Sequence, residues 1–202
     1  MIKVHLDTDF ATVIAIGPYT NLARLDPLSL GRVVLMGGWV DAPTAGLPQW
    51  GPNMDWNVQC DTTAAVAVFD AATDLTLATL PATLASHISE SDLPRLGAAG
   101  TVGQLLARQA RAHGDEYQLR TLSCAHAALP DDLLNFQYDP VACAVALGWT
   151  GARVEPISLR PQMDGDVLRF DRVDGGKVVN VVTEVDADAF AERWLSAVEQ
   201  LP

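Results

Sequence analysis

The sequence predicts a single α/β domain with a mostly parallel sheet and flanking helices, and two observations support this class. Short runs rich in β-branched residues recur up to residue 80, and helix-like stretches lie between the later runs. This alternation is typical of parallel sheets, because parallel neighbours need a long crossover connection. With 202 residues and a hydrophobic content of 49%, the chain can bury one core. We therefore expect one domain over residues 1–202.

The β-branched runs mark the first expected strands. They cover residues 4–6, 12–16, 32–36 and 75–80. Between them, residues 20–23 predict a short helix that stops before Asp26-Pro27. Asp61 is a suitable N-cap for a helix through residues 64–68, because its side chain can accept a backbone hydrogen bond.

The second half of the chain predicts helices first and a strand-rich tail afterwards. A long helical pattern runs from about residue 91 to 113, and a polar, irregular stretch at 114–135 is expected to form a flap. Asp139-Pro140 begins a helix over 141–147, since proline is favoured at a helix start. The tail predicts strands at 154–159, 167–170 and 178–182, followed by an amphipathic helix at 186–200.

The composition narrows the classes of partner. The net charge is −12 and the 13 basic residues are scattered, so no basic patch is expected for nucleic acid. A cation or an uncharged polar ligand suits this charge better. No apolar run approaches the roughly 18 residues of a membrane span, and the N-terminus leads directly into a strand, so we expect a cytoplasmic protein. Cys60, Cys124 and Cys143 lack disulfide or zinc spacing and are expected to be reduced thiols.

The Asp7-Thr8-Asp9 motif follows the first expected strand and is the clearest candidate for chemistry. Two carboxylates at a strand's carboxyl end can hold a cation or activate water. Only Phe10 and Ala11 separate Asp9 from the next run. Residues 8–11 reach at most about 14 Å, whereas returning past a five-residue strand takes about 16 Å. If both runs are strands, they form a hairpin or one of them is displaced.

Three further segments place polar residues just after an apolar strand or at a helix start, where open α/β sheets bind ligands. They are Gly17-Pro18-Tyr19-Thr20-Asn21, the Met36-Gly37-Gly38 run that leads to Asp55-Trp56-Asn57-Val58-Gln59-Cys60-Asp61, and Tyr138-Asp139-Pro140. Together with the first motif, these segments resemble the inosine-uridine-preferring nucleoside hydrolase family over nearly the whole chain. The resemblance implies a mostly parallel α/β fold, hydrolysis of the N-glycosidic bond of ribonucleosides, a bound calcium ion and homo-oligomers.

The resemblance also implies roles for individual residues. Asp9 matches the carboxylate that binds calcium and acts as general base toward the attacking water, and Asp7 lies beside it. Asp139 and the backbone carbonyl of Ile16 match further calcium ligands. Asp55 and Asn57 match the acidic residue and the amide that hold the ribose hydroxyls, and they would share a face if that segment is extended. A base would then be released by a water that attacks C1′.

Three more residues are candidates for substrate binding. Gln49 stands where members of the family often have an asparagine, six positions before the acidic residue. Tyr138 stands where purine-active members often carry histidine. His126, in the expected flap, could face the leaving base. Trp39, Trp50 and Trp56 could stack on a base, although aromatic core packing explains them equally well.

The departures from the family pattern concern the calcium site. Members continue, a few residues after Asp9, with a glycine and a pair of aspartates, whereas this chain has Phe10-Ala11-Thr12-Val13. The strands and helices that members of the family have between the first motif and the Gly-Pro-x-Thr-Asn strand are also absent, so the chain resembles an internally shortened member. In a hairpin, Asp9 and Ile16 could not both ligate one ion. We therefore predict weak calcium binding and little or no hydrolase activity.

Other interpretations of the sequence remain open. Asp7 and Asp9 could be turn-forming residues, and an Asp-x-Asp strand end is also found in haloacid-dehalogenase-like phosphatases. The phosphatase interpretation lacks basic groups for a phosphate, since Lys3 and Lys177 are the only lysines. A non-catalytic module that binds nucleoside or ribose is a third interpretation. A gene-model artefact would also explain the short junction.

Overall fold

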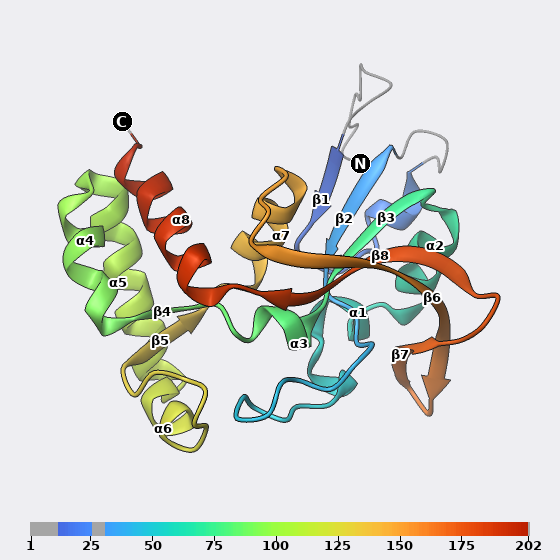
Figure 1. Cartoon of the computed structure of the whole chain (residues 1–202), viewed down its shortest axis with the longest axis horizontal. Coiled ribbons are helices and arrows are strands. Elements are labelled where there is room, and N and C mark those ends of the chain that lie inside the picture. The colour runs from blue at the N-terminus through green and yellow to red at the C-terminus, as the bar shows by residue number, and fades with distance from the viewer. Residues whose placement is uncertain (1–11, 26–30, 202) are drawn as a thin grey trace.

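The computed structural model describes residues 12–25 and 31–201, and within them the main sheet has six strands in the order β1-β2-β3-β8-β6-β7 (Figure 1). The strands are β1 (Thr12–Ala15), β2 (Arg32–Met36), β3 (Asp74–Ala78), β6 (Ala152–Asp164), β7 (Val167–Arg172) and β8 (Lys177–Val185). The first four strands in that order run parallel. Strand β6 pairs with β8 in antiparallel fashion, and β7 pairs with β6 in the same way. The predicted α/β class with a mostly parallel sheet is confirmed.

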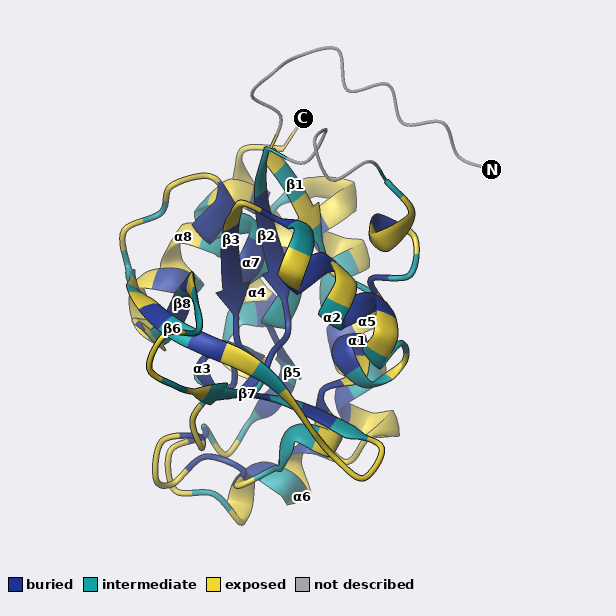
Figure 2. Ribbon diagram, turned by 90° about the vertical axis from the view of Figure 1, so that its right-hand side faces the viewer, coloured by how far each residue is buried: buried dark blue, intermediate teal, exposed yellow. Residues whose placement is uncertain are grey.

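Helices cover both faces of the parallel strands, which explains the continuous apolar runs in the sequence. Val33 and Leu35 of β2 point into a core shared with α2 (Thr62–Ala71). Their neighbours in the strand point to the opposite core, shared with α7 (Tyr138–Ala146) and α8 (Ala187–Glu199). Figure 2 shows the consequence, since β2 and β3 are almost entirely buried.

A helical region lies beside the sheet and contains elements that the sequence pattern missed (Figure 1). Its elements are β4 (His87–Ser89), η4 (Glu90–Asp92), α4 (Leu93–Ala98), α5 (Gly100–Glu116), α6 (Leu119–Cys124) and β5 (Leu133–Phe136). The short helix α3 (Leu80–Thr83) precedes this region and packs on β8. The long helix expected from residue 91 is therefore two helices that meet at Ala99. Strands β4 and β5 pair in antiparallel fashion and form a second, two-stranded sheet.

The prediction that residues 114–135 form an irregular stretch was wrong. The segment contains α6 and the start of β5, and Leu119, Leu129 and Leu133 are buried in one apolar cluster. The polar residues between these leucines obscure their spacing in the sequence. Burial of the leucines anchors the segment on the helical region.

The short connecting elements complete the description. They are η1 (Leu22–Arg24), η3 (Pro52–Met54) and α1 (Trp56–Gln59). Asp61 caps α2 through the Ala64 amide at 2.9 Å, and Asp186 caps α8 through the Ala189 amide at 3.0 Å. Both capping aspartates begin their helices where the sequence predicts, because their carboxylates satisfy otherwise unpaired amides.

Some predictions fall on residues that the structure leaves undescribed. Asp7, Asp9 and the strand expected at 4–6 lie outside the described residues, and so does the junction that led us to expect a hairpin. Within the described part of the chain, β1 is an edge strand that pairs with β2 alone.

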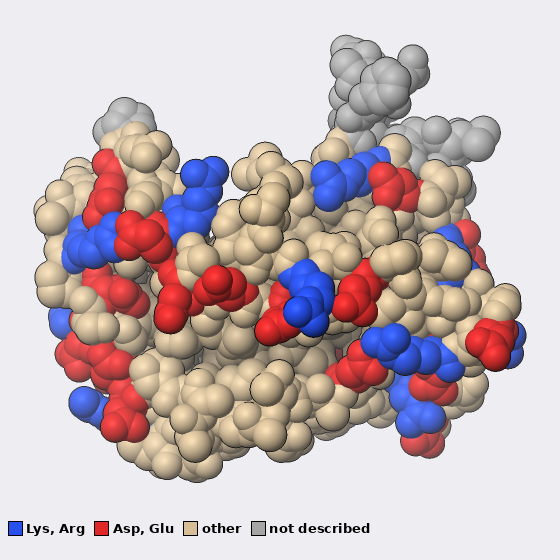
Figure 3. Space-filling view, in the orientation of Figure 1, with Lys and Arg blue, Asp and Glu red and all other residues tan. Residues whose placement is uncertain are grey.

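Charged side chains of both signs alternate over the surface in Figure 3. Arg153 pairs with Glu184, and Arg172 pairs with Asp41 at 2.6 Å. This interspersed pattern on the face shown agrees with the scattered basic residues of the sequence. No helix among the described residues is long and apolar enough to cross a membrane.

Candidate functional site

Five of the residues that the sequence singles out line one cavity of about 230 Å³: Ile16, Asp55, Asn57, Tyr138 and Asp139. The rest of its lining is apolar or aromatic. It consists of Met36, Trp50, Met54, Trp56 and Leu80. The cavity therefore combines two carboxyl groups and one amide with an aromatic wall.

The fold explains why residues so far apart in sequence meet here. Strands β1 and β2 are parallel neighbours, so their carboxyl ends, where Ile16 and Met36 lie, are at the same edge of the sheet. Helix α7 packs on both strands and begins at Tyr138, which brings its first turn to that edge. Gly37 and Gly38, both with positive φ, turn the chain away from β2.

Asp55 is buried, with 1% of its surface exposed, and is held by backbone amides. Its carboxylate accepts hydrogen bonds from the Gly38 amide at 2.5 Å and the Val58 amide at 3.2 Å. Burial raises the pKa of Asp55 to about 6, and the amide hydrogen bonds oppose that rise. At neutral pH the carboxylate is mostly ionised, and each oxygen keeps a lone pair for a further donor.

Asn57 is also buried and its side chain is oriented by the end of β2. Its Nδ2 donates to the Met36 carbonyl at 3.0 Å and lies 3.3 Å from the Met36 sulfur. Because the NH₂ group is used in this way, the Oδ1 atom of Asn57 is left as the acceptor of the amide.

Residues 55–57 are helical rather than extended, so the two side chains do not share a face through strand alternation. Asp55 is the N-cap of α1, and Asn57 lies in the first turn of that short helix. The carboxylate of Asp55 stabilises the turn by accepting the Val58 amide, which is the ordinary function of an N-cap. Both side chains line the cavity because the turn packs against the end of β2.

Tyr138 and Asp139 contribute the first turn of α7. The Tyr138 ring stacks on Phe136 with the ring centroids 5.4 Å apart. Burial raises the pKa of Asp139 and that of the Tyr138 hydroxyl above their ordinary values. Asp139 is only half-buried, so its carboxylate has access to solvent and to a ligand.

Gln49 and His126 are not among the described residues that line the cavity. The Gln49 amide donates to the carbonyls of Thr44 and Leu47, at 3.1 and 3.0 Å, and so fastens its own loop. The His126 Nδ1 atom lies 2.8 Å from the Leu122 carbonyl at the end of α6. Their roles toward a substrate stay predictions.

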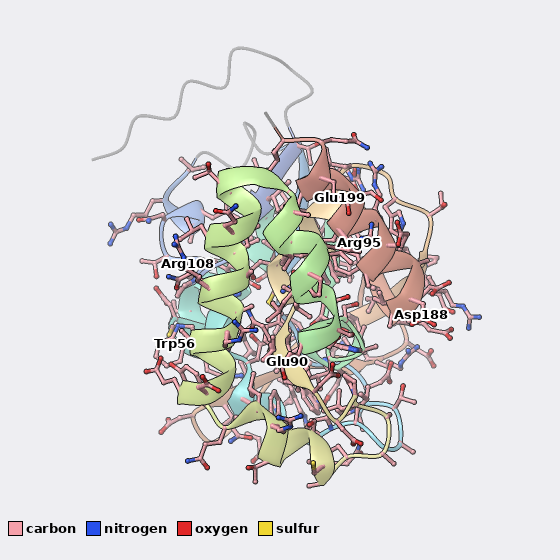
Figure 4. All side chains as sticks on the ribbon, turned by 90° about the vertical axis from the view of Figure 1, so that its left-hand side faces the viewer. Trp56, Glu90, Arg95, Arg108, Asp188 and Glu199 are labelled. Carbon is pink, nitrogen blue, oxygen red and sulfur yellow. The ribbon has the colours of Figure 1, made fainter. Side chains whose placement is uncertain are left out.

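Besides the predicted ligand-binding groups, the cavity has apolar and aromatic lining residues, of which the sequence analysis did not single out Met54 and Leu80. Met36 is the last residue of β2, Leu80 begins α3 just after β3, and Met54 precedes Asp55. Trp50 meets Phe136 edge-on with the ring centroids 5.9 Å apart. Trp56 is 75% exposed and projects from the surface in Figure 4. The sequence analysis named both tryptophans as possible stacking residues, and both line the cavity.

The described residues provide an incomplete set of calcium ligands. Calcium takes six to eight oxygen atoms. The cavity offers the carboxylates of Asp55 and Asp139 and the main chain at Ile16, and Asp55 is already bonded to two amides. No cluster of three acidic, histidine or cysteine side chains with metal-binding geometry occurs in ranges 12–25 and 31–201. Asp7 and Asp9 lie outside those ranges.

Comparison with known proteins gives one consistent family. The sequence profile of the inosine-uridine preferring nucleoside hydrolases matches residues 2–192. The pyrimidine-specific ribonucleoside hydrolase RihA of Enterobacter sp. (strain 638) is 34% identical over 118 residues, which are 52% of this chain and 36% of the relative. The non-specific ribonucleoside hydrolase RihC of Salmonella paratyphi B is 33% identical over 101 residues, which are 47% of this chain and 31% of the relative.

The solved structures show the same fold. The purine-preferring ribonucleoside hydrolase from Gardnerella vaginalis superposes with a TM-score of 0.74 at 22% identity, over 93% of this chain and 60% of that one. In the sequence comparison, this chain spans about a third of the length of the two curated relatives named above. The activity of the longer proteins does not pass to it by similarity alone.

Proposed function

Because the chain belongs to the inosine-uridine preferring nucleoside hydrolase family, we propose that its cavity binds a ribonucleoside through the ribose and that its reaction is hydrolysis of the N-glycosidic bond. The observation that carries this proposal is the convergence of Asp55, Asn57 and Asp139 on one small cavity. These groups arrive from two separate segments, so their meeting depends on the fold rather than on local sequence.

The polar groups of the cavity suit a diol. The two carboxylates accept hydrogen bonds when ionised, and the Asn57 amide presents its oxygen because its NH₂ group is bonded to Met36. A set of acceptors recognises hydroxyl donors. Adjacent ribose hydroxyls supply two such donors at a spacing that neighbouring side chains can reach, and a phosphate or carboxylate would be repelled.

The remaining lining suits a planar aglycone. Trp50, Trp56 and Tyr138 provide aromatic faces and edges beside the acceptor groups. A nucleobase can stack on such surfaces with little dependence on its identity. The named relatives are described as pyrimidine-specific, non-specific and purine-preferring, so the family does not fix the base.

The chemical step would proceed as follows. A water oxygen bonds to C1′ while the bond from C1′ to the base nitrogen breaks, and the base leaves with the electron pair and takes up a proton. The transition state resembles an oxocarbenium ion, so the negative charge of Asp139 beside the cavity stabilises it. The resemblance gives Asp9 the role of accepting the proton of the water. A calcium ion, when bound, would supply Lewis-acid activation of that water.

We infer that turnover is slow compared with that of the longer relatives. The acceptor groups of the cavity support ribose binding, whereas Phe10-Ala11-Thr12-Val13 replaces the aspartate pair that the family pattern has after Asp9. A second candidate function follows from the same observation, namely a nucleoside- or ribose-binding protein without turnover. In both cases the ribose contacts are the shared feature.

Release of free base from ribonucleosides distinguishes the two functions. The chain is incubated with inosine, uridine, adenosine and cytidine, with and without calcium, and the free base is separated and measured. Calcium-dependent release that disappears in Asp139→Asn supports hydrolysis. Binding without release supports the second candidate. If the chain neither binds nor cleaves any of the four nucleosides, the proposal is overturned.

A further inference from the structure

Tyr19 is buried directly behind the candidate cavity, although it is not among the residues that line it. It follows the Gly17-Pro18 pair after β1, and 2% of its surface is exposed. Its ring packs in the apolar cluster that contains Leu22, Leu35 and Val58. A core position requires only an apolar ring, so the hydroxyl group of this tyrosine needs a separate explanation.

The Tyr19 hydroxyl donates a hydrogen bond to the Met36 carbonyl at 2.7 Å. The same carbonyl accepts the Asn57 amide at 3.0 Å. A carbonyl oxygen has two lone pairs, and these two donors occupy both. The Met36 carbonyl therefore connects Tyr19, in the segment after β1, to the Asn57 side chain of α1.

Close packing around Gly37 reinforces this connection. A Cβ atom at Gly37 would lie 2.5 Å from the Tyr19 hydroxyl and 3.1 Å from Asp55 Oδ1. The hydroxyl, the Asp55 carboxylate and the backbone after β2 thus occupy one compact space that only glycine permits. The Tyr19 hydroxyl therefore lies against the same backbone position as a carboxylate that lines the cavity.

We propose that Tyr19 is a positioning residue of the candidate ribose site, which through the Met36 carbonyl fixes the orientation of the Asn57 amide. With the hydroxyl in place, Asn57 has one favourable orientation, in which Nδ2 meets Met36 and Oδ1 is left for a ligand. Without it, a lone pair of the carbonyl becomes free and the amide can move toward it. This inference rests on the proposed function for its consequence on binding, but the Tyr19–Met36–Asn57 connection is independent of that function.

The test uses Tyr19→Phe, which keeps the ring and removes only the hydroxyl, with Tyr117→Phe as the matched control. Tyr117 is 61% exposed and lies at the end of α5. The side-chain amide resonances of Asn57 are measured in ¹H–¹⁵N spectra of the full chain without ligand, after assignment with Asn57→Ala. We expect these resonances to move in Tyr19→Phe and to stay in place in Tyr117→Phe. Unchanged resonances in both would overturn the proposal.

Binding of uridine supplies the second measurement. The loss of one buried hydrogen bond corresponds to a rise in Kd of about three- to tenfold in Tyr19→Phe. In an Asn57→Ala background the same substitution should leave Kd unchanged, because the effect passes through Asn57. An equal loss of affinity in both backgrounds would indicate a general structural role and would contradict the proposal. If the wild-type chain binds no uridine, the proposed function fails, and the Asn57 resonances still decide the inference.

Discussion

The Asp55 carboxylate accepts a hydrogen bond from the backbone amide of Gly38 at 2.5 Å, which links the N-cap of α1 to the turn that follows β2. The contact is buried and couples a candidate ligand-binding group to the end of the sheet. Its strength depends on the charge of the carboxylate, because an ionised acceptor forms the stronger hydrogen bond. The protonation of Asp55 should therefore be visible in both stability and binding.

The stability of the folded chain should depend on pH through Asp55. Its pKa is raised from 3.8 to about 6, so the folded state holds this proton more tightly than the unfolded state. The contribution of Asp55 is most favourable below about pH 4, decreases as the pH rises and is lost above about pH 6. The free energy of unfolding of the wild type, relative to that of Asp55→Asn, should fall across this range. A difference between the two proteins that is constant with pH would contradict this prediction.

Gly37 should tolerate no side chain. Its φ is +135°, and a Cβ atom would lie 2.5 Å from the Tyr19 hydroxyl. We expect Gly37→Ala to lower the free energy of unfolding by about 1–3 kcal/mol, because strain and a clash add. Gly165→Ala is the control, since Gly165 has a φ of +59° with nothing within 4 Å of a Cβ atom. Equal destabilisation of the two variants by chemical denaturation would refute the close packing behind the cavity.

Trp56 should contribute to nucleoside binding and not to ribose binding. The side chain is 75% exposed, so Trp56→Ala removes little packing. Stacking on an aromatic ring contributes about 1–3 kcal/mol per base, which predicts at least a fivefold weaker affinity for uridine. Free ribose serves as the internal control. A variant that loses affinity for both ligands equally would show that Trp56 supports the cavity rather than the base.

Calcium affinity should be weak. The described carboxylates of the cavity are Asp55, which is bonded to two amides, and Asp139. Asp7 and Asp9 lie outside the described residues. Even with them, Phe10-Ala11-Thr12-Val13 replaces the aspartate pair of the family pattern, so we expect few charged ligands and a Kd of about 10⁻⁴–10⁻³ M. Calorimetric titration with calcium chloride measures this value, and Asp139→Asn should weaken it further, whereas Asp131→Asn, at an exposed position, should not. A micromolar or tighter site would show that a complete shell exists.

The sequence predicted features that follow from local chemistry or from the general geometry of parallel sheets. The cap at Asp61 and the start of the last helix at Asp186 were predicted, because an aspartate before an apolar run favours a helix start. The meeting of Asp55, Asn57 and Asp139 was expected because polar residues after parallel strands share one edge of the sheet.

Features that depend on particular contacts between individual groups were missed. Strand β4 has only three residues and is stabilised by pairing with β5, so it leaves no pattern of its own. Gln49 was placed by spacing from Asp55, yet its amide satisfies carbonyls of its own loop. The Tyr19 hydroxyl gave no signal in the sequence, because its partner is a backbone carbonyl 17 residues away.

The most direct test of whether the cavity recognises the ribose hydroxyls is calorimetric titration with uridine and 2′-deoxyuridine. The wild type should bind uridine about tenfold more tightly, because the buried acceptors lose a donor when the 2′-hydroxyl is absent. Asn57→Ala should reduce this preference, and Asn53→Ala, at an exposed position outside the cavity, should retain it. Equal affinity of the wild type for the two nucleosides would contradict the proposed ribose site.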